Sequence, residues 1–218
     1  FAGRELKVLL GHDPRPTSDA LLAAHVRGML AAAAAAGRRL QVVNLGLIAT
    51  PAFEESVREL RAAGGLMVTA SHCPTPQNGS KYTCGVLDRS RGRHPLAGAL
   101  LPAGDMAEVM AGAEALVQAF ANGDGELIRR LNEVDDVAVT RALTVHPLCR
   151  EQAWVAFLGF LRRQLALTET EDLDAFRSAV RGAALVLDPN GGTACGTGAV
   201  LLRNFGFEVH EVNGVSGR

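Results

Sequence analysis

The sequence predicts an α/β protein: a three-layer α/β/α domain with a mixed, largely parallel sheet, followed by the start of a second α/β/α domain. Short apolar runs of strand length alternate with longer segments of helical periodicity. The connections between them are short, which is typical of βαβ units and therefore of parallel strands covered by helices. This alternation gives way to a helix-rich stretch and begins again near residue 183.

The first part of the chain has the order β-α-β-α-β, with strands expected at 6–10, 40–45 and 66–69. Between them lie two segments with apolar residues at helical spacing. We expect the first helix to be capped by Thr17 or Ser18 and the second by Thr50, with Pro51 opening it. Right-handed crossovers bring the carboxyl ends of the strands to one edge of the sheet. The loops that follow the strands should therefore converge there, at 11–18, 46–51 and 70–81.

The later elements are a set of helices and a second βαβ unit. We expect helices at 105–121, 151–166 and 171–181, then a strand at 183–187, a short helix at 198–205 and a strand at 207–212. This order predicts a first domain over residues 1–150 and part of a second over residues 151–218. Because Phe1 and Arg218 lie close to strand-like runs, we expect the chain to be a piece of a longer protein.

The composition narrows the class of protein. Apolar residues make up 48% of the chain and aromatic residues only 5%, which predicts an aliphatic core. The net charge of −1 argues against nucleic acid and membrane partners, and no apolar run reaches the roughly 18 residues of a membrane span. Four cysteines without a CxxC pair predict neither a disulfide framework nor a zinc site, which favours a cytoplasmic location.

The segment from Thr69 to Lys81 carries the strongest chemical signal. Ser71 stands where a buried strand opens into a polar turn, and a phosphoryl group on it would need cationic donors. Lys81 can approach it across the Asn78-Gly79 turn, and His72 can move a proton near neutral pH. Arg15, from the loop after the first strand, could share the site. The alternative is structural: Ser71 caps a turn and His72 is an ordinary surface residue.

Other patterns point to structure more than to chemistry. Adjacent residues in an extended segment point to opposite sides, so His72 and Cys73 are not expected to form a nucleophilic pair. The glycines at 191–198 match neither the dinucleotide fingerprint nor the phosphate loop of nucleotide-binding proteins, which predicts a structural turn. Residues 122–126 have too few carboxylates for a calcium loop, and we expect a helix-to-helix turn. Three arginines predict an exposed basic loop: Arg89, Arg91 and Arg93.

Four stretches together resemble the α-D-phosphohexomutase superfamily, which includes phosphoglucomutases and phosphomannomutases. The segment Thr69–Lys81 (T-A-S-H-C-P…N-G-S-K) is similar to the family's phosphoserine loop, roughly T-A-S-H-N-P…N-G-x-K. Residues 8–18 resemble its first strand and aspartate–arginine–serine turn, and residues 45–51 its G-x-x-x-T-P element. Residues 185–192 together with 201–212 resemble the opening of its second domain.

The resemblance implies a four-domain enzyme that interconverts hexose 1-phosphate and hexose 6-phosphate through a hexose 1,6-bisphosphate intermediate, which also acts as activator. It implies that Ser71 carries the phosphoryl group and binds Mg²⁺ through it, that His72 is a general acid or base, and that Lys81 and Arg15 bind phosphate. The expected partner is a phosphorylated hexose, and the expected state is a monomer or homodimer.

Two departures from the family's pattern keep a second class of function open. Cys73 replaces the asparagine that follows the family's histidine, and no aspartate-rich D-G-D-x-D-R metal loop occurs, so the remaining magnesium ligands are not expected in this chain. The alternative is a catalytically silent α/β binding or regulatory module derived from the family. A nucleotide-binding α/β domain has only the fold class in its favour.

Overall fold

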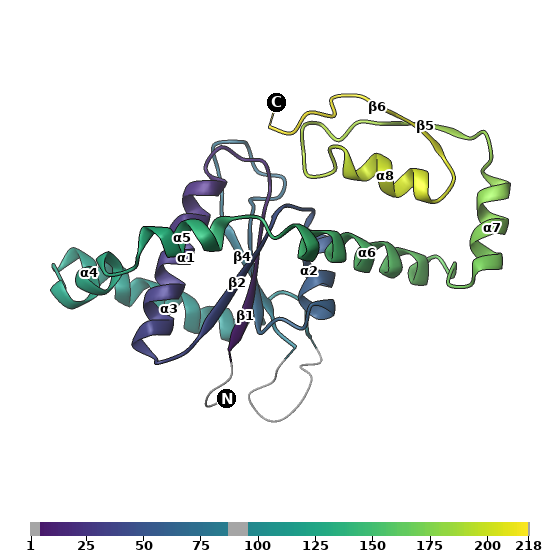
Figure 1. The fold of residues 1–218 in the computed structure, drawn as a ribbon. Coiled ribbons are helices and arrows are strands. Elements are labelled where there is room, and N and C mark those ends of the chain that lie inside the picture. The colour runs from purple at the N-terminus through teal and green to yellow at the C-terminus, as the bar shows by residue number, and fades with distance from the viewer. Residues whose placement is uncertain (1–4, 87–95, 218) are drawn as a thin grey trace.

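The computed structural model describes residues 5–86 and 96–217, and it has the predicted α/β architecture (Figure 1). The main sheet contains four strands in the order β2-β1-β3-β4. Strands β1 (Leu6–His12), β2 (Leu40–Leu47) and β3 (Gly64–Val68) are parallel, and β4 (Ser80–Cys84) runs antiparallel beside β3. The sheet is therefore mixed and largely parallel, as predicted.

Helices cover both faces of this sheet and make three layers (Figure 1). Successive strand residues point to opposite faces, so Leu9 and Leu10 belong to different cores. One core joins the strands to α1 (Ser18–Ala35) and α5 (Asp136–Leu143), through Leu10, Leu66, Val68, Leu22, Val26 and Val139. The other joins them to α2 (Thr50–Glu59) and α6 (Pro147–Gln164), through Leu9, Val43, Leu45, Met67, Phe53, Val57 and Ala153.

Helix α2 approaches the sheet closely because two strand residues lack side chains. The fully buried Phe53 lies against Gly11 on β1 and Gly65 on β3. A Cβ atom on Gly11 would lie 2.8 Å from Phe53 Cδ2, and one on Gly65 would lie 2.8 Å from Phe53 Cζ. These distances are too short for carbon atoms, so the two glycines make room for the aromatic ring.

The middle of the chain contains more helices than the sequence predicted. Helix α3 (Ala103–Ala121) ends before Asn122 and Gly123 as expected, and the turn leads into α4 (Gly125–Asn132). The helix-to-helix turn expected at residues 122–126 implied a helix after it, but no bounds were predicted for α4, and α5 was not predicted. Each has only eight residues, too short for a clear apolar periodicity. Their best signal is the capping aspartate before each helix: Asp124 accepts from the amides of Glu126 and Leu127, and Asp135 from that of Val137.

Helix α6 connects the main sheet to a smaller βαβ unit (Figure 1). In that unit β5 (Ala184–Leu187) and β6 (Glu208–Glu211) form a parallel pair, joined by α8 (Thr197–Asn204). A third core links the end of α6 to α7 (Thr170–Ala179) and α8, through Leu158, Leu161, Leu167, Leu173, Phe176, Phe205 and Phe207. The predicted domain boundary near residue 150 falls within α6, whose first half packs on the main sheet, and it stays a prediction.

The cap of α2 differs from the one the sequence predicted, and the cap of α1 agrees with the prediction in position alone. Thr50 is the first residue of α2, and Ala49 occupies the capping position. Thr17 does occupy the capping position of α1, but it makes no side-chain capping bond. Its hydroxyl accepts a hydrogen bond from Asn78 Nδ2, because the cap lies beside the loop after β3. The predicted basic loop with Arg89, Arg91 and Arg93 lies outside the described residues.

Candidate active site

Two loops meet where β1 and β3 end, at the edge of the sheet predicted to carry the reacting groups. Residues 13–17 follow β1, and residues 69–79 connect β3 to β4. The amide of Asp13 donates to Val68 O at 3.0 Å, and the amide of Thr69 donates to Gly79 O at 2.9 Å. The third predicted loop adjoins β1 from the other side, because the amide of Ile48 donates to His12 O. Parallel pairing of β1 with both neighbours produces this convergence.

Asp13 is the centre of the hydrogen bonds that join the two loops. It is buried, and its carboxylate accepts from Thr69 Oγ1 at 2.7 Å, Ser18 Oγ at 3.3 Å, and the amide and Nε of Arg15. Thr69 Oγ1 in turn accepts from the amide of Ser71 at 2.9 Å. Because Thr69 donates its only proton to Asp13, its lone pairs are free to accept the amide of Ser71. Asp13 thus orients Ser71 through Thr69.

Ser71 is exposed, next to the hydrogen bonds that join the two loops, and its backbone has a left-handed conformation (φ 55°). Such a conformation is costly for a residue other than glycine and persists where surrounding contacts enforce it. Lys81, on β4, donates from Nζ to Ser71 Oγ at 2.7 Å. The structure therefore brings together Ser71 and Lys81, as the sequence predicted from the Asn78-Gly79 turn.

The other predicted site residues are placed differently. Arg15 lies beside the Ser71 loop, but its guanidinium points to backbone carbonyl oxygens of that loop. The His72 side chain is exposed and has no hydrogen-bond partner within the described ranges, 5–86 and 96–217. Cys73 is exposed too; its amide donates to Ala70 O and its carbonyl oxygen accepts from Arg15. His72 and Cys73 form no hydrogen-bonded pair with each other, in agreement with the prediction.

Of the three residues that position the site, Asp13 and Thr69 had no assigned role in the sequence analysis, and Asn78 was predicted only as part of a turn. Asp13 and Thr69 are the hub and the relay to Ser71, and Asn78 ties the loop to α1 by donating to the hydroxyls of Thr17 and Ser18. One usable signal was the type of residue: an aspartate and a threonine directly after buried strands that end at one edge. That they pair with each other depends on the register of β1 and β3.

Charges around Lys81 add a further electrostatic feature. Glu54, on α2, is half-buried, and burial raises the pKa of its carboxyl group, while the positive charges of Lys81 and Arg58 act in the opposite direction. Lys81 therefore interacts both with the half-buried carboxyl group of Glu54 and with the exposed Ser71.

The βαβ unit contributes its own turn, and the contacts described there are within the protein. Gly196, at the capping position of α8, donates its amide to Glu211 Oε1 at 2.7 Å, so a carboxylate of this chain occupies the helix N-terminus. The amide of Gly191 donates to Asn213 O. These contacts agree with the prediction of a structural turn at residues 191–198. Gly217 approaches the active-site edge, since a Cβ atom on it would lie 3.6 Å from Pro14 O.

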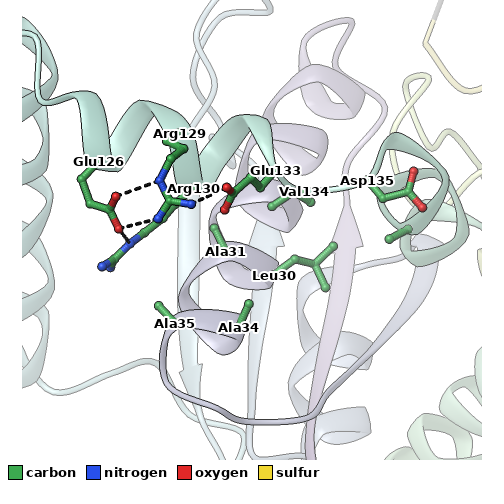
Figure 2. A pocket seen from close by; sticks show the side chains of 11 residues that line it. Leu30, Ala31, Ala34, Ala35, Glu126, Arg129, Arg130, Glu133, Val134 and Asp135 are labelled. Carbon is green, nitrogen blue, oxygen red and sulfur yellow. Dashed lines mark hydrogen bonds and ion pairs between the residues drawn. The ribbon is translucent and has the colours of Figure 1, made fainter.

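A cavity of about 510 Å³ lies between α1, α4 and α5, away from Ser71 (Figure 2). Its floor consists of Leu30 and alanines, and its rim is an ion-pair network in which Glu126 binds Arg129 and Arg130, while Arg129 also binds Glu133. Hydrogen bonds from Arg130 and Arg129 lower the pKa of Glu126. The charges of the rim therefore largely satisfy one another.

The described residues contain neither a cluster of metal-binding side chains nor a helix that could span a membrane. Within residues 5–86 and 96–217, no three His, Cys, Asp or Glu side chains are grouped closely enough to hold a metal ion. No helix in those ranges is both long enough and apolar enough to cross a membrane.

The sequence and the fold are both similar to those of phosphohexomutases. The sequence profile of "Phosphoglucomutase/phosphomannomutase, alpha/beta/alpha domain I" matches residues 2–86. A phosphoglucosamine mutase of Parasynechococcus marenigrum is 49% identical over 85 residues, which cover 37% of this chain and 17% of that protein. A phosphoglucosamine mutase of Thermobifida fusca is 38% identical over 94 residues, covering 43% of this chain and 18% of that protein.

A solved structure extends the similarity of fold beyond the matched domain. The putative phosphomannomutase of Thermus thermophilus superposes with a TM-score of 0.50 at 24% identity, over 96% of this chain and 37% of that one. In length, the segments matched by sequence cover under a fifth of the phosphoglucosamine mutases of Parasynechococcus marenigrum and Thermobifida fusca. Residues 2–86 thus match α/β/α domain I of the phosphoglucomutase/phosphomannomutase family, and their sequence is similar to that of phosphoglucosamine mutases.

Proposed function

We propose that this chain is the phosphoserine-bearing part of a phosphohexomutase, and that Ser71 carries the transferred phosphoryl group between hexose 1-phosphate and hexose 6-phosphate. The observation that carries the proposal is the hydrogen bond of 2.7 Å from Lys81 Nζ to the exposed Ser71 Oγ. An ammonium group at this distance stabilises negative charge on the serine oxygen, whether that oxygen attacks or leaves.

The transfer is a displacement at phosphorus. A sugar hydroxyl attacks the phosphorus atom on Ser71, the bond between phosphorus and Ser71 Oγ breaks, and the electron pair stays on Oγ. Lys81 stabilises that charge until Oγ takes up a proton. The attacking hydroxyl gives its proton to a general base, for which His72 is our candidate because its ring is exposed next to Ser71. The reverse sequence loads Ser71 from a hexose 1,6-bisphosphate.

The residues described here fit only part of a magnesium site. Phosphorylated Ser71 would offer anionic oxygens, which are the ligands that Mg²⁺ prefers, and the bound ion would neutralise charge on the phosphoryl group. Because no three His, Cys, Asp or Glu side chains of residues 5–86 and 96–217 gather at one point, the other ligands would have to come from outside this part of the chain. Residues that select the sugar would likewise have to come from outside this part of the chain.

The test is covalent labelling of the protein by glucose 1,6-bisphosphate, followed by intact mass measurement and peptide mapping. We expect one phosphoryl group on Ser71, none on the Ser71→Ala variant, and normal labelling of the Ser80→Ala variant as the matched control. Thermal stability should be nearly the same in Ser71→Ala and the wild type, because the Ser71 side chain is exposed.

Two results would count against the proposal. If glucose 1,6-bisphosphate labels no residue in the wild type, even when the rest of a mutase is supplied in one longer chain, the alternative of a silent binding or regulatory module gains support. Cys73, in place of the family's asparagine, is the residue that favours this alternative. If Ser71→Ala lowers the melting temperature strongly, Ser71 acts as a structural cap.

A further inference from the structure

Arg15 uses its whole guanidinium group within the protein. Nε donates to Asp13 Oδ2 at 3.0 Å, Nη1 donates to Pro74 O at 2.8 Å and Gln77 O at 2.9 Å, and Nη2 donates to Ser71 O at 3.1 Å and Cys73 O at 2.7 Å. A guanidinium carries five N–H groups in a fixed planar fork. Each of them therefore has an acceptor, and none is left for an anion.

The surroundings of Arg15 keep the fork in place. Its side chain and that of Asp13 are each only 11% exposed, so their ion pair is shielded from water. The amide of Arg15 also donates to Asp13 Oδ1 at 3.2 Å. Since Asp13 is held in turn by Thr69 and Ser18, the guanidinium is anchored to the ends of β1 and β3 before it reaches the loop.

The four carbonyl groups that Arg15 binds belong to the loop that carries Ser71. They span residues 71–77, a stretch that is exposed and contains no helix or strand. Within it Ser71 has the left-handed φ of 55° that nearby contacts must enforce. Without Arg15, few other described contacts would hold this backbone: the amide of Ser71 on Thr69, and two short turns inside the loop.

We infer that Arg15 is a positioning residue: it fastens the Ser71 loop to the edge of the sheet so that Ser71 Oγ stays on Lys81 Nζ, and it is not a ligand of the substrate's phosphate. This changes the role that the sequence predicted for Arg15 and leaves Lys81 as the cation that faces Ser71. The effect of Arg15 on phosphoryl transfer rests on the proposed function of Ser71. That Arg15 holds the Ser71 loop at the edge of the sheet does not depend on that function.

Replacement of Arg15 by lysine distinguishes a phosphate ligand from a positioning residue. Lysine keeps the positive charge but offers three donors at one point, so it cannot span four carbonyl groups and Asp13. A phosphate ligand would tolerate Arg15→Lys better than Arg15→Ala, whereas a positioning residue would fail in both. Arg27→Lys is the matched control, because Arg27 also bridges carbonyl oxygens (those of Leu131 and Val134) and a carboxylate (Asp136), far from Ser71.

The primary measurement is amide hydrogen exchange of the intact protein, with no ligand added. We expect the hydrogen-bonded loop amides of Ser71, Cys73 and Gln77 to exchange more than about tenfold faster in Arg15→Lys and in Arg15→Ala. The amides of β1 and β3 should exchange as in the wild type, which shows that the domain stays folded. Arg27→Lys should leave the loop unchanged. If Arg15→Ala does not fold, Arg15→Gln takes its place.

The second measurement is the rate at which glucose 1,6-bisphosphate labels Ser71. Arg15→Lys should slow labelling at saturating donor, with little change in the donor concentration for half-maximal rate, because the loop and not the binding of phosphate is altered. Wild-type exchange at the loop in Arg15→Lys, or a weaker apparent affinity alone, would overturn the inference. Absence of labelling in the wild type would count against the proposed function, while the exchange result would still decide the role of Arg15.

Discussion

His25, on α1, is a half-buried titratable residue next to the strand that carries Lys81. Its ring nitrogen Nε2 lies 2.8 Å from Ser80 Oγ, and its ring meets that of Tyr82 edge to face at 6.0 Å between centroids. Burial lowers the pKa of His25 below its ordinary value of 6.5. In the folded protein the imidazole is therefore neutral under conditions where an unfolded chain would already protonate it.

This difference makes the stability of the protein depend on pH. Below about pH 6.5 the unfolded state binds more protons at His25 than the folded state, so the free energy of unfolding should fall as the pH decreases through that range. Well above about pH 6.5 the contribution of His25 to the free energy of unfolding no longer changes with pH. We expect His25→Gln, which keeps a polar group near Ser80, to reduce the loss of stability between pH 7.5 and pH 5.5 in urea unfolding.

The control for this effect is His210→Gln, at an exposed position on β6. It should leave the pH dependence as it is in the wild type. An unchanged pH dependence in His25→Gln would mean that other groups cause the acid sensitivity.

Helices α2 and α3 show that burial, and not the number of apolar residues, decides how much a helix contributes to stability. Phe53 of α2 is fully buried between Gly11, Gly65 and Val57. Helix α3 is also rich in apolar residues, but none of those described on it is buried, and Phe120 remains 58% exposed. The hydrophobic contribution of a side chain follows the area removed from water, so composition alone cannot rank the two helices.

We expect Phe53→Ala to lower the free energy of unfolding by about 3–5 kcal/mol, because it removes a buried ring and leaves a cavity. Phe120→Ala, the same substitution on α3, should change it by less than about 0.5 kcal/mol. Urea unfolding followed by circular dichroism measures both. A large effect of Phe120→Ala would show that α3 is covered in solution, for example by another molecule of the protein.

At the scale of the whole molecule, α6 ties two packed regions together (Figure 1). Its first half contributes Ala153 to the core of the main sheet, and its second half contributes Leu158 and Leu161 to the core around α7 and α8. Arg163 of α6 also pairs with the buried Glu55 of α2 at 2.9 Å. The smaller unit has a sheet of only two strands, which is marginal by itself, and Val186 on β5 is 74% exposed.

The smaller unit should therefore open more easily than the main sheet. In native-state hydrogen exchange we expect the amides of β5 and β6 to open at a lower free energy than those of β1 and β3. Leu173→Ala, in the third core, should speed exchange in residues 184–211 by about tenfold or more and leave β1 and β3 unchanged. Leu22→Ala is the matched control and should destabilise the main sheet. Equal acceleration everywhere in Leu173→Ala would mean that the two regions unfold as one.

The order of most elements and the place of Ser71 at the end of a strand could be predicted from the sequence because their causes are local. Apolar runs and turn residues predicted the strands near Val8, Val43 and Met67, and the parallel order placed their ends at one edge. The turn at Asn78 and Gly79 predicted that Lys81 returns to Ser71, and the two atoms are 2.7 Å apart.

The tertiary structure decided what depends on residues distant in the sequence. Asp13 and Thr69 are 56 positions apart and meet only through the register of β1 and β3. Arg15 has the charge of a phosphate ligand, but the folded loop presents four carbonyl oxygens to it, and its donors bind them. The sequence by itself determined the three parallel strands of the main sheet and the place of Ser71 at a strand end, but not β4. Only the packing of two loops at one sheet edge decided which side chains hold Ser71 and which face outward, because such contacts have no local pattern.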